Sequence, residues 1–131
     1  MKENLKHLES DTDGMMAYDY IVNNVENCLE DMPELLEHLK RVDHSGQFLA
    51  SSARFLAAVD RNIFGEAIES LIEEAIEKDR ERRYISSLLE AIWGKDYQER
   101  AEQLKAVDNN FRRIYKRIYP RTIPYTRLEE E

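Results

Sequence analysis

The hydrophobic positions of the chain recur at steps of three and four residues, the spacing of an amphipathic helix. The first such stripe lies on one helical face and consists of Met15, Tyr18, Val22, Val25, Leu29 and Met32. Asp31, Pro33 and Glu34 then supply the capping groups and the first-turn proline that are typical of a new helix. We therefore predict a short second helix that buries Leu35, Leu36, Leu39 and Val42.

A third helix is predicted from a cap at Ser45 to about Val59. Arg54 is the only charged residue between Phe48 and Val59, and the apolar residues of this segment point to more than one face. This pattern predicts a central helix with Phe48, Arg54 and Phe55 at an interface within the chain or with a second subunit. Arg54 would then need either water or an anionic partner.

The next stripe runs from Phe64 to Ile76 and resumes from Tyr84 to Trp93. The polar segment between them contains no glycine or proline, and Asp79 and Arg83 are one helical turn apart. We therefore predict one long helix near residues 62–93, ended by Gly94. A last helix is predicted from near Asp96 to Pro120.

These segments define the predicted fold. Only four glycines and three prolines occur among 131 residues, and no alternating pattern typical of a strand is found. We predict an all-α helical bundle of four to six helices in one domain over residues 1–119, with residues 1–12 as a candidate disordered segment and 120–131 as an extended tail. Residues 70–73 resemble residues 87–90, but their offset of 17 matches no known repeat length, so no repeat is predicted.

Composition narrows the class of protein. Hydrophobic residues make up 42% of the chain and charged residues 35%, which suits a solvated globular domain. The sequence has no apolar run that could cross a membrane or act as a secretory signal, and its one cysteine, Cys28, excludes an internal disulfide. We expect a cytoplasmic protein with no membrane partner, and a structural role for Cys28.

The net charge of −8 is unevenly distributed, because residues 1–60 carry −7, residues 61–94 carry −3 and residues 95–131 carry +2. No acidic residue occurs between Phe111 and Arg127. We predict a partner-binding basic patch that consists of Arg112, Arg113, Lys116, Arg117 and Arg121 together with Tyr115 and Tyr119. Its partner could be the acidic part of the same chain or of a second copy, another acidic protein, or nucleic acid.

One short acidic segment suggests an enzyme. Residues 73–77 read Glu-Glu-Ala-Ile-Glu and resemble the first half of the acidic signature of the all-α nucleoside triphosphate pyrophosphohydrolases. The resemblance covers these five residues and implies a magnesium site at Glu73, Glu74 and Glu77. The downstream Glu-x-x-Asp of that family appears here in reverse, as Asp96-x-x-Glu99. His7, His38 and His44 lack the helical spacing of a metal site.

The sequence favours a non-enzymatic interaction or regulatory module without a cofactor, acting as a homodimer. The apolar faces around Arg54 motivate the dimer, because a small monomer would have difficulty covering them. Nucleic-acid binding through the basic patch is the first alternative. Magnesium-dependent nucleotide pyrophosphohydrolysis at the three glutamates is the second.

Overall fold

The computed structural model describes residues 2–120 of the chain, and residues 121–131, which include Arg121 and all of the predicted tail after Pro120, lie outside them. Within this range the fold is all-helical with no strand, which confirms the predicted class, but it has eight helical segments where four to six were expected. The segments are η1 (Glu3–Ser10), a 3₁₀ helix, and the α-helices α1 (Met15–Asn23), α2 (Met32–Val42), α3 (Gln47–Val59), α4 (Gly65–Lys78), α5 (Ser86–Trp93), α6 (Ala101–Val107) and α7 (Asn109–Ile118).

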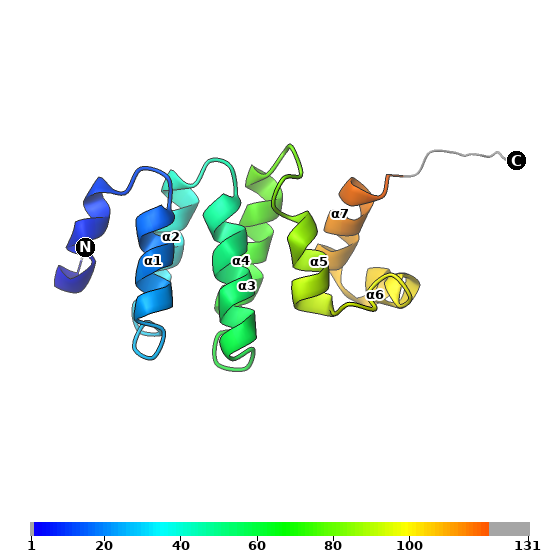
Figure 1. Ribbon diagram of the computed structural model, residues 1–131, viewed down its shortest axis with the longest axis horizontal. Helices are drawn as coiled ribbons and strands as arrows, with labels where there is room; N and C mark the ends of the chain where they lie inside the picture. The colour runs from blue at the N-terminus through cyan, green and yellow to red at the C-terminus, as the bar shows by residue number, and fades with distance from the viewer. Residues whose placement is uncertain (1, 121–131) are drawn as a thin grey trace, which may run out of the picture.

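The helices form antiparallel pairs that stand side by side in a row (Figure 1). In one layer α3 contacts both α1 and α5, and in the other layer α4 contacts both α2 and α7. Each pair therefore buries its apolar stripes against its neighbours in the row. Helix η1 adds Leu5 and Leu8 to the core at the N-terminal end. No helix of the described range is long and apolar enough to cross a membrane.

A buried aspartate precedes the first helix of each of the three pairs, α1–α2, α3–α4 and α5–α7. Asp11, Asp43 and Asp79 are at most 5% exposed, and each carboxylate accepts hydrogen bonds from main-chain N–H groups up to six residues further on. The three positions are separated by 32 and 36 residues. Repeats of this length are typical of stacked helical units, so these turns indicate a repeat other than the 17-residue similarity between residues 70–73 and 87–90.

The prediction of one long helix near residues 62–93 is wrong, because α4 and α5 are separate helices. The chain leaves the helical path at Asp79, whose Oδ2 accepts hydrogen bonds from the main-chain N–H groups of Tyr84, at 2.6 Å, and Ile85, at 2.8 Å. Arg82 adopts a left-handed conformation with a φ of 61°. The carboxylate thus caps the start of α5 and turns the chain back, although neither glycine nor proline is present to mark the turn.

Helix α3 occupies the central position that the sequence predicts, since it contacts α1, α2, α4 and α5. Leu49, Ala50, Ala53 and Leu56 have no exposed surface. The chain itself therefore covers most of the apolar surface of α3, and this helix no longer requires a second subunit. The predicted last helix is divided into α6 and α7 by Asp108, whose carboxylate accepts a hydrogen bond from the N–H of Phe111.

Candidate functional site

Basic residues of three segments gather at one edge of the row, where α2, α4 and α7 end. We call this the basic edge and define it as Lys40, Arg41, Lys78, Arg80, Arg82, Arg83, Lys116 and Arg117. Three of its side chains connect the helix ends. Lys78 donates hydrogen bonds to the carbonyl oxygens of Lys40 and Asp43, and Arg117 donates to the carbonyl of Ile76 at 2.7 Å. Arg82 donates to the carbonyl of Arg117 at 3.1 Å, so the three ends form one continuous surface.

Local chemistry explains why the cations gather there. The last four carbonyl groups of an α-helix lack partners within the helix and carry a partial negative charge. Lysine and arginine side chains satisfy these carbonyls at the ends of α2, α4 and α7. A carbonyl does not neutralise a cation as a carboxylate does, so the edge keeps most of its positive charge.

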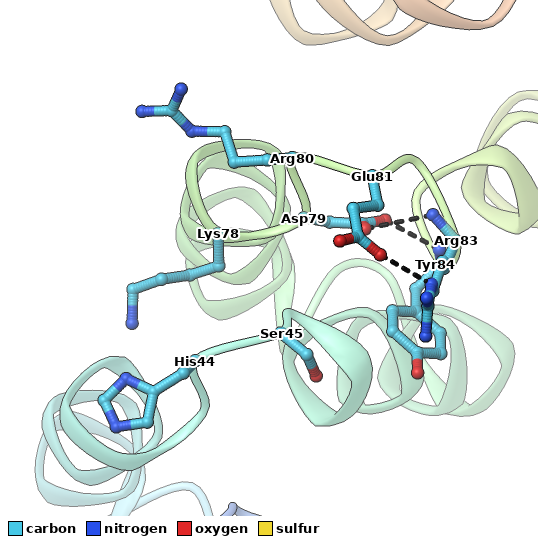
Figure 2. A pocket seen from close by; sticks show the side chains of 8 residues that line it. All are labelled: His44, Ser45, Lys78, Asp79, Arg80, Glu81, Arg83 and Tyr84. Atoms are coloured by element: carbon cyan, nitrogen blue, oxygen red, sulfur yellow. Dashed lines mark hydrogen bonds and ion pairs between the residues drawn. The ribbon is translucent and has the colours of Figure 1, made fainter.

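A hollow of about 340 Å³ opens on this edge between the α2–α3 and α4–α5 loops. Figure 2 shows His44 and Lys78 on one side of it and Arg83 with Tyr84 on the other. The carboxylate of Glu81 lies 2.8 Å from Nε of Arg83, and both side chains are largely exposed. Lys78, Arg80 and Arg83 therefore surround a space of side-chain size together with the carboxylates of Asp79 and Glu81 and the half-buried ring of Tyr84.

Helix α7 separates the predicted basic patch into two rows. Arg112 and Lys116 face solvent, and Lys116 makes no hydrogen bond or ion pair with residues 2–120. Arg113 and Arg117 face α4, where Arg113 lies 2.8 Å from the Glu77 carboxylate. One row thus contacts the C-terminal part of α4, through the Glu77 carboxylate and the Ile76 carbonyl, and the other row remains accessible.

The two aromatic members of the patch, Tyr115 and Tyr119, contact other side chains of the same chain. Tyr115 stacks on Phe111 at a centroid distance of 5.3 Å, and its ring also contacts Lys105. The hydroxyl of Tyr119 lies 2.8 Å from that of Tyr97. This hydrogen bond, with burial as a second cause, raises the pKa of Tyr97 to about 12. Of these rings, Tyr119 is the most exposed, at 40%.

The three residues predicted for the central helix, Phe48, Arg54 and Phe55, are half-buried in α3. Phe48 lies against Tyr18 with a centroid distance of 6.1 Å, and Phe55 packs on the main core. Arg54 donates hydrogen bonds to the hydroxyls of Ser51 and Ser87. Its partners are thus neutral hydroxyl groups of the same chain, where the sequence suggested water or an anion.

The three glutamates of the magnesium alternative are spread along α4. Glu73 lines a hollow of about 280 Å³ that faces Asp108, Asn109 and Asn110, whereas Glu77 is engaged by a cation. Within residues 2–120, no three histidine, cysteine, aspartate or glutamate side chains are grouped so that they could hold a metal ion. The structure therefore does not bring Glu73, Glu74 and Glu77 together as a ligand set.

Sequence reasoning missed the α4–α5 loop as part of the site. Its signal is present, because residues 78–83 contain four cations in six positions, but helical periodicity places that segment in the polar middle of a long helix. His38 was also missed. It is 2% exposed and pairs with Asp11, and its position three residues after Leu35 and four before Val42 places it on the apolar face of the second predicted helix. Comparison of the chain with protein-family models, curated proteins and solved structures finds no match.

Proposed function

We propose that this protein is a non-enzymatic interaction module whose basic edge binds an acidic segment of another protein. The observation that carries the proposal is the set of cations that three helix ends bring together. Four of them, Lys78, Arg80, Arg82 and Arg117, donate to main-chain carbonyls and therefore retain positive charge. Electrostatic complementarity of this kind promotes association and selects partners of opposite charge.

The hollow on the edge supports an acidic side chain as the contacting group. Arginine binds carboxylates through parallel N–H donors, and the terminal nitrogens of Arg83 make no hydrogen bond within the described residues. Tyr84 adds an aromatic wall beside them. An aspartate or glutamate of a partner would find both donors and an apolar contact in this hollow.

Selection of random peptides displayed on phage against the immobilised protein tests the proposal. The selected peptides should be enriched in aspartate and glutamate, and fluorescence anisotropy should show about tenfold weaker binding to the Arg80→Glu variant. Lys95→Glu is the matched control, because Lys95 is an exposed cation in the α5–α6 loop at the opposite edge of the row. Peptides without acidic enrichment, or equal losses in both variants, would contradict the proposal.

Nucleic acid is the second candidate, favoured by the solvent-facing row of Arg112 and Lys116. Labelled RNA and DNA should be titrated at low and moderate salt, because phosphate contacts weaken steeply as salt rises. Salt-dependent binding that is lost in Lys116→Glu, without selection of acidic peptides, would replace the first proposal. Self-association, which the sequence favoured, is tested separately by sedimentation velocity across protein concentrations.

A further inference from the structure

A second surface lies at the opposite ends of α2 and α4 and has the opposite chemical character. A groove of about 590 Å³ runs between the loop before α2 and the beginning of α4. Most of its lining is apolar, and it consists of Leu29, Met32, Pro33, Leu36, Ile63 and Ala67, with Asn62, Glu66 and Ser70 as polar members.

The groove exposes large apolar side chains to solvent. Met32 and Ala67 are buried in its floor, at 4% and 6% exposure. Leu29 and Ile63 stand on its rim at 50% and 56% exposure, and they are two of the six large apolar residues that are exposed in the described range. Burying such side chains against a partner releases water and is favourable.

The segments that form the groove are strongly acidic. Residues 24–37 contain five acidic side chains and no basic one, and residues 60–74 contain five acidic side chains and one basic residue, Arg61. Arg61 donates to the carbonyl oxygens of Ala91 and Ile92, so its guanidinium is directed toward the end of α5. Asp31 is paired with Lys2, which leaves the remaining carboxylates to set the field around the groove.

We infer that this groove binds the apolar face of a basic amphipathic helix from a partner protein. An amphipathic helix presents apolar anchors at positions i, i+3, i+4 and i+7, which suits an apolar groove between two segments. Lysine or arginine residues beside those anchors would face Glu66 of the lining and the other carboxylates of the two acidic segments. This inference does not depend on the proposed function, because the basic edge lies at the other ends of the same two helices.

The probe is a fluorescein-labelled synthetic helix that has leucine at the anchor positions and lysine elsewhere. A companion peptide has glutamate in place of lysine. Fluorescence anisotropy at low salt should show binding of the lysine peptide, weaker binding at high salt, and little binding of the glutamate peptide. Equal binding of the two peptides would overturn the assignment of a basic partner.

Two double variants locate the binding. Leu29→Ser combined with Ile63→Ser should weaken binding of the lysine peptide by about tenfold or more. Met15→Ser combined with Val107→Ser is the matched control, because these residues are also exposed and apolar but lie outside the groove, and it should leave binding unchanged. Circular dichroism verifies that both variants are folded.

Equal losses of lysine-peptide binding in the two double variants would show that the peptide does not bind in this groove. Sedimentation of the unmodified protein tests the other occupant, since self-association that Leu29→Ser with Ile63→Ser abolishes would assign the groove to a second copy and overturn the partner helix. Arg80→Glu should not alter binding of the lysine peptide. If the basic edge does not bind acidic peptides, the proposed function fails, but the inference about the groove still depends only on the variants at Leu29 and Ile63.

Discussion

Nε2 of His38 lies 2.9 Å from Oδ2 of Asp11, and both side chains are almost completely buried. The same carboxylate accepts hydrogen bonds from the N–H groups of Gly14, Met16 and Ala17. One side chain thus caps α1 and attaches it to α2. This contact holds together the first pair of helices in the row.

Replacing Asp11 should destabilise the protein strongly. Asp11→Ala removes the helix cap and leaves a buried ring nitrogen of His38 without its partner, so we expect a loss of about 2–4 kcal/mol in the free energy of unfolding. Urea denaturation measures it. Asp13→Ala is the control, because Asp13 is exposed and accepts one hydrogen bond, from the N–H of Met15. Similar losses in the two variants would show that the buried pair has no special role.

Acid should also weaken the N-terminal region. A hydrogen bond from Lys2 lowers the pKa of Asp31 despite its burial, and further bonds come from Asn4 and Tyr20. Burial alone would raise the pKa of Asp11, but its hydrogen bonds from His38 and the main chain outweigh burial and lower it. The unfolded state therefore binds more protons in the acid range, and stability falls as pH drops below about 4.

Urea denaturation at a series of acid pH values measures this dependence. Asp31→Asn should reduce the dependence of unfolding free energy on pH, because one of the two carboxylates no longer titrates. Asp19→Asn is the control, since Asp19 is exposed and makes no hydrogen bond with another described side chain. A steeper loss of stability in Asp31→Asn than in the unmodified protein would contradict the prediction.

The Tyr97–Tyr119 pair should be visible in an alkaline titration. The pKa of Tyr97 is raised to about 12, first by its hydrogen bond with Tyr119 and second by burial. Tyr119→Phe removes that hydrogen bond, so the pKa of Tyr97 should fall toward the ordinary tyrosine value of about 10. The difference in ultraviolet absorbance between proteins with and without Tyr97→Phe isolates this group. An unchanged Tyr97 titration in Tyr119→Phe would refute the prediction.

The turn between the first two pairs requires glycine at position 46. Gly46 has a φ of 87°, and a Cβ atom added there would lie 3.0 Å from Cβ of Asp79 and 3.3 Å from the carbonyl oxygen of Ala75. Gly46→Ala should therefore cost about 1–3 kcal/mol of unfolding free energy. Gly65→Ala should instead be neutral or stabilising by up to about 1 kcal/mol, because Gly65 is in α4 and its Cβ would meet nothing within 4 Å. Thermal denaturation of both variants checks the opposite signs.

Asp11-x-x-Gly14 and Asp43-x-x-Gly46 show which part of the fold was readable from the sequence. Helical periodicity predicts the class because the stripes must be buried whatever the arrangement of the helices. The repeat is marked by these two identical spacings, 32 residues apart, but in the third turn Arg82 takes the place of glycine. That substitution hides both the repeat and the break in the predicted long helix.

The candidate site was predictable only in part. Arg113 and Lys116 belong to one cationic segment, and the sequence alone cannot show that α4 engages the first and leaves the second in solvent. The position of residues 78–83 beside the end of α7 depends on tertiary packing between segments more than 30 residues apart. Local patterns contain no information about such contacts, so the hollow with Tyr84 could not be predicted.

Ser52 offers a test of packing within the central helix. Its hydroxyl is fully buried in α3 and has no hydrogen-bond partner among the described residues. A buried polar group without a partner loses its hydration on folding and gains no hydrogen bond in exchange. Ser52→Ala should therefore keep or raise the free energy of unfolding, by up to about 1 kcal/mol. Ser51→Ala is the matched control and should lower the free energy of unfolding, because the Ser51 hydroxyl accepts a hydrogen bond from Arg54 at 3.2 Å.

Urea denaturation compares the unfolding free energies of the Ser52→Ala and Ser51→Ala variants. A loss of more than about 1 kcal/mol in Ser52→Ala would show that the Ser52 hydroxyl does have a stabilising partner in solution.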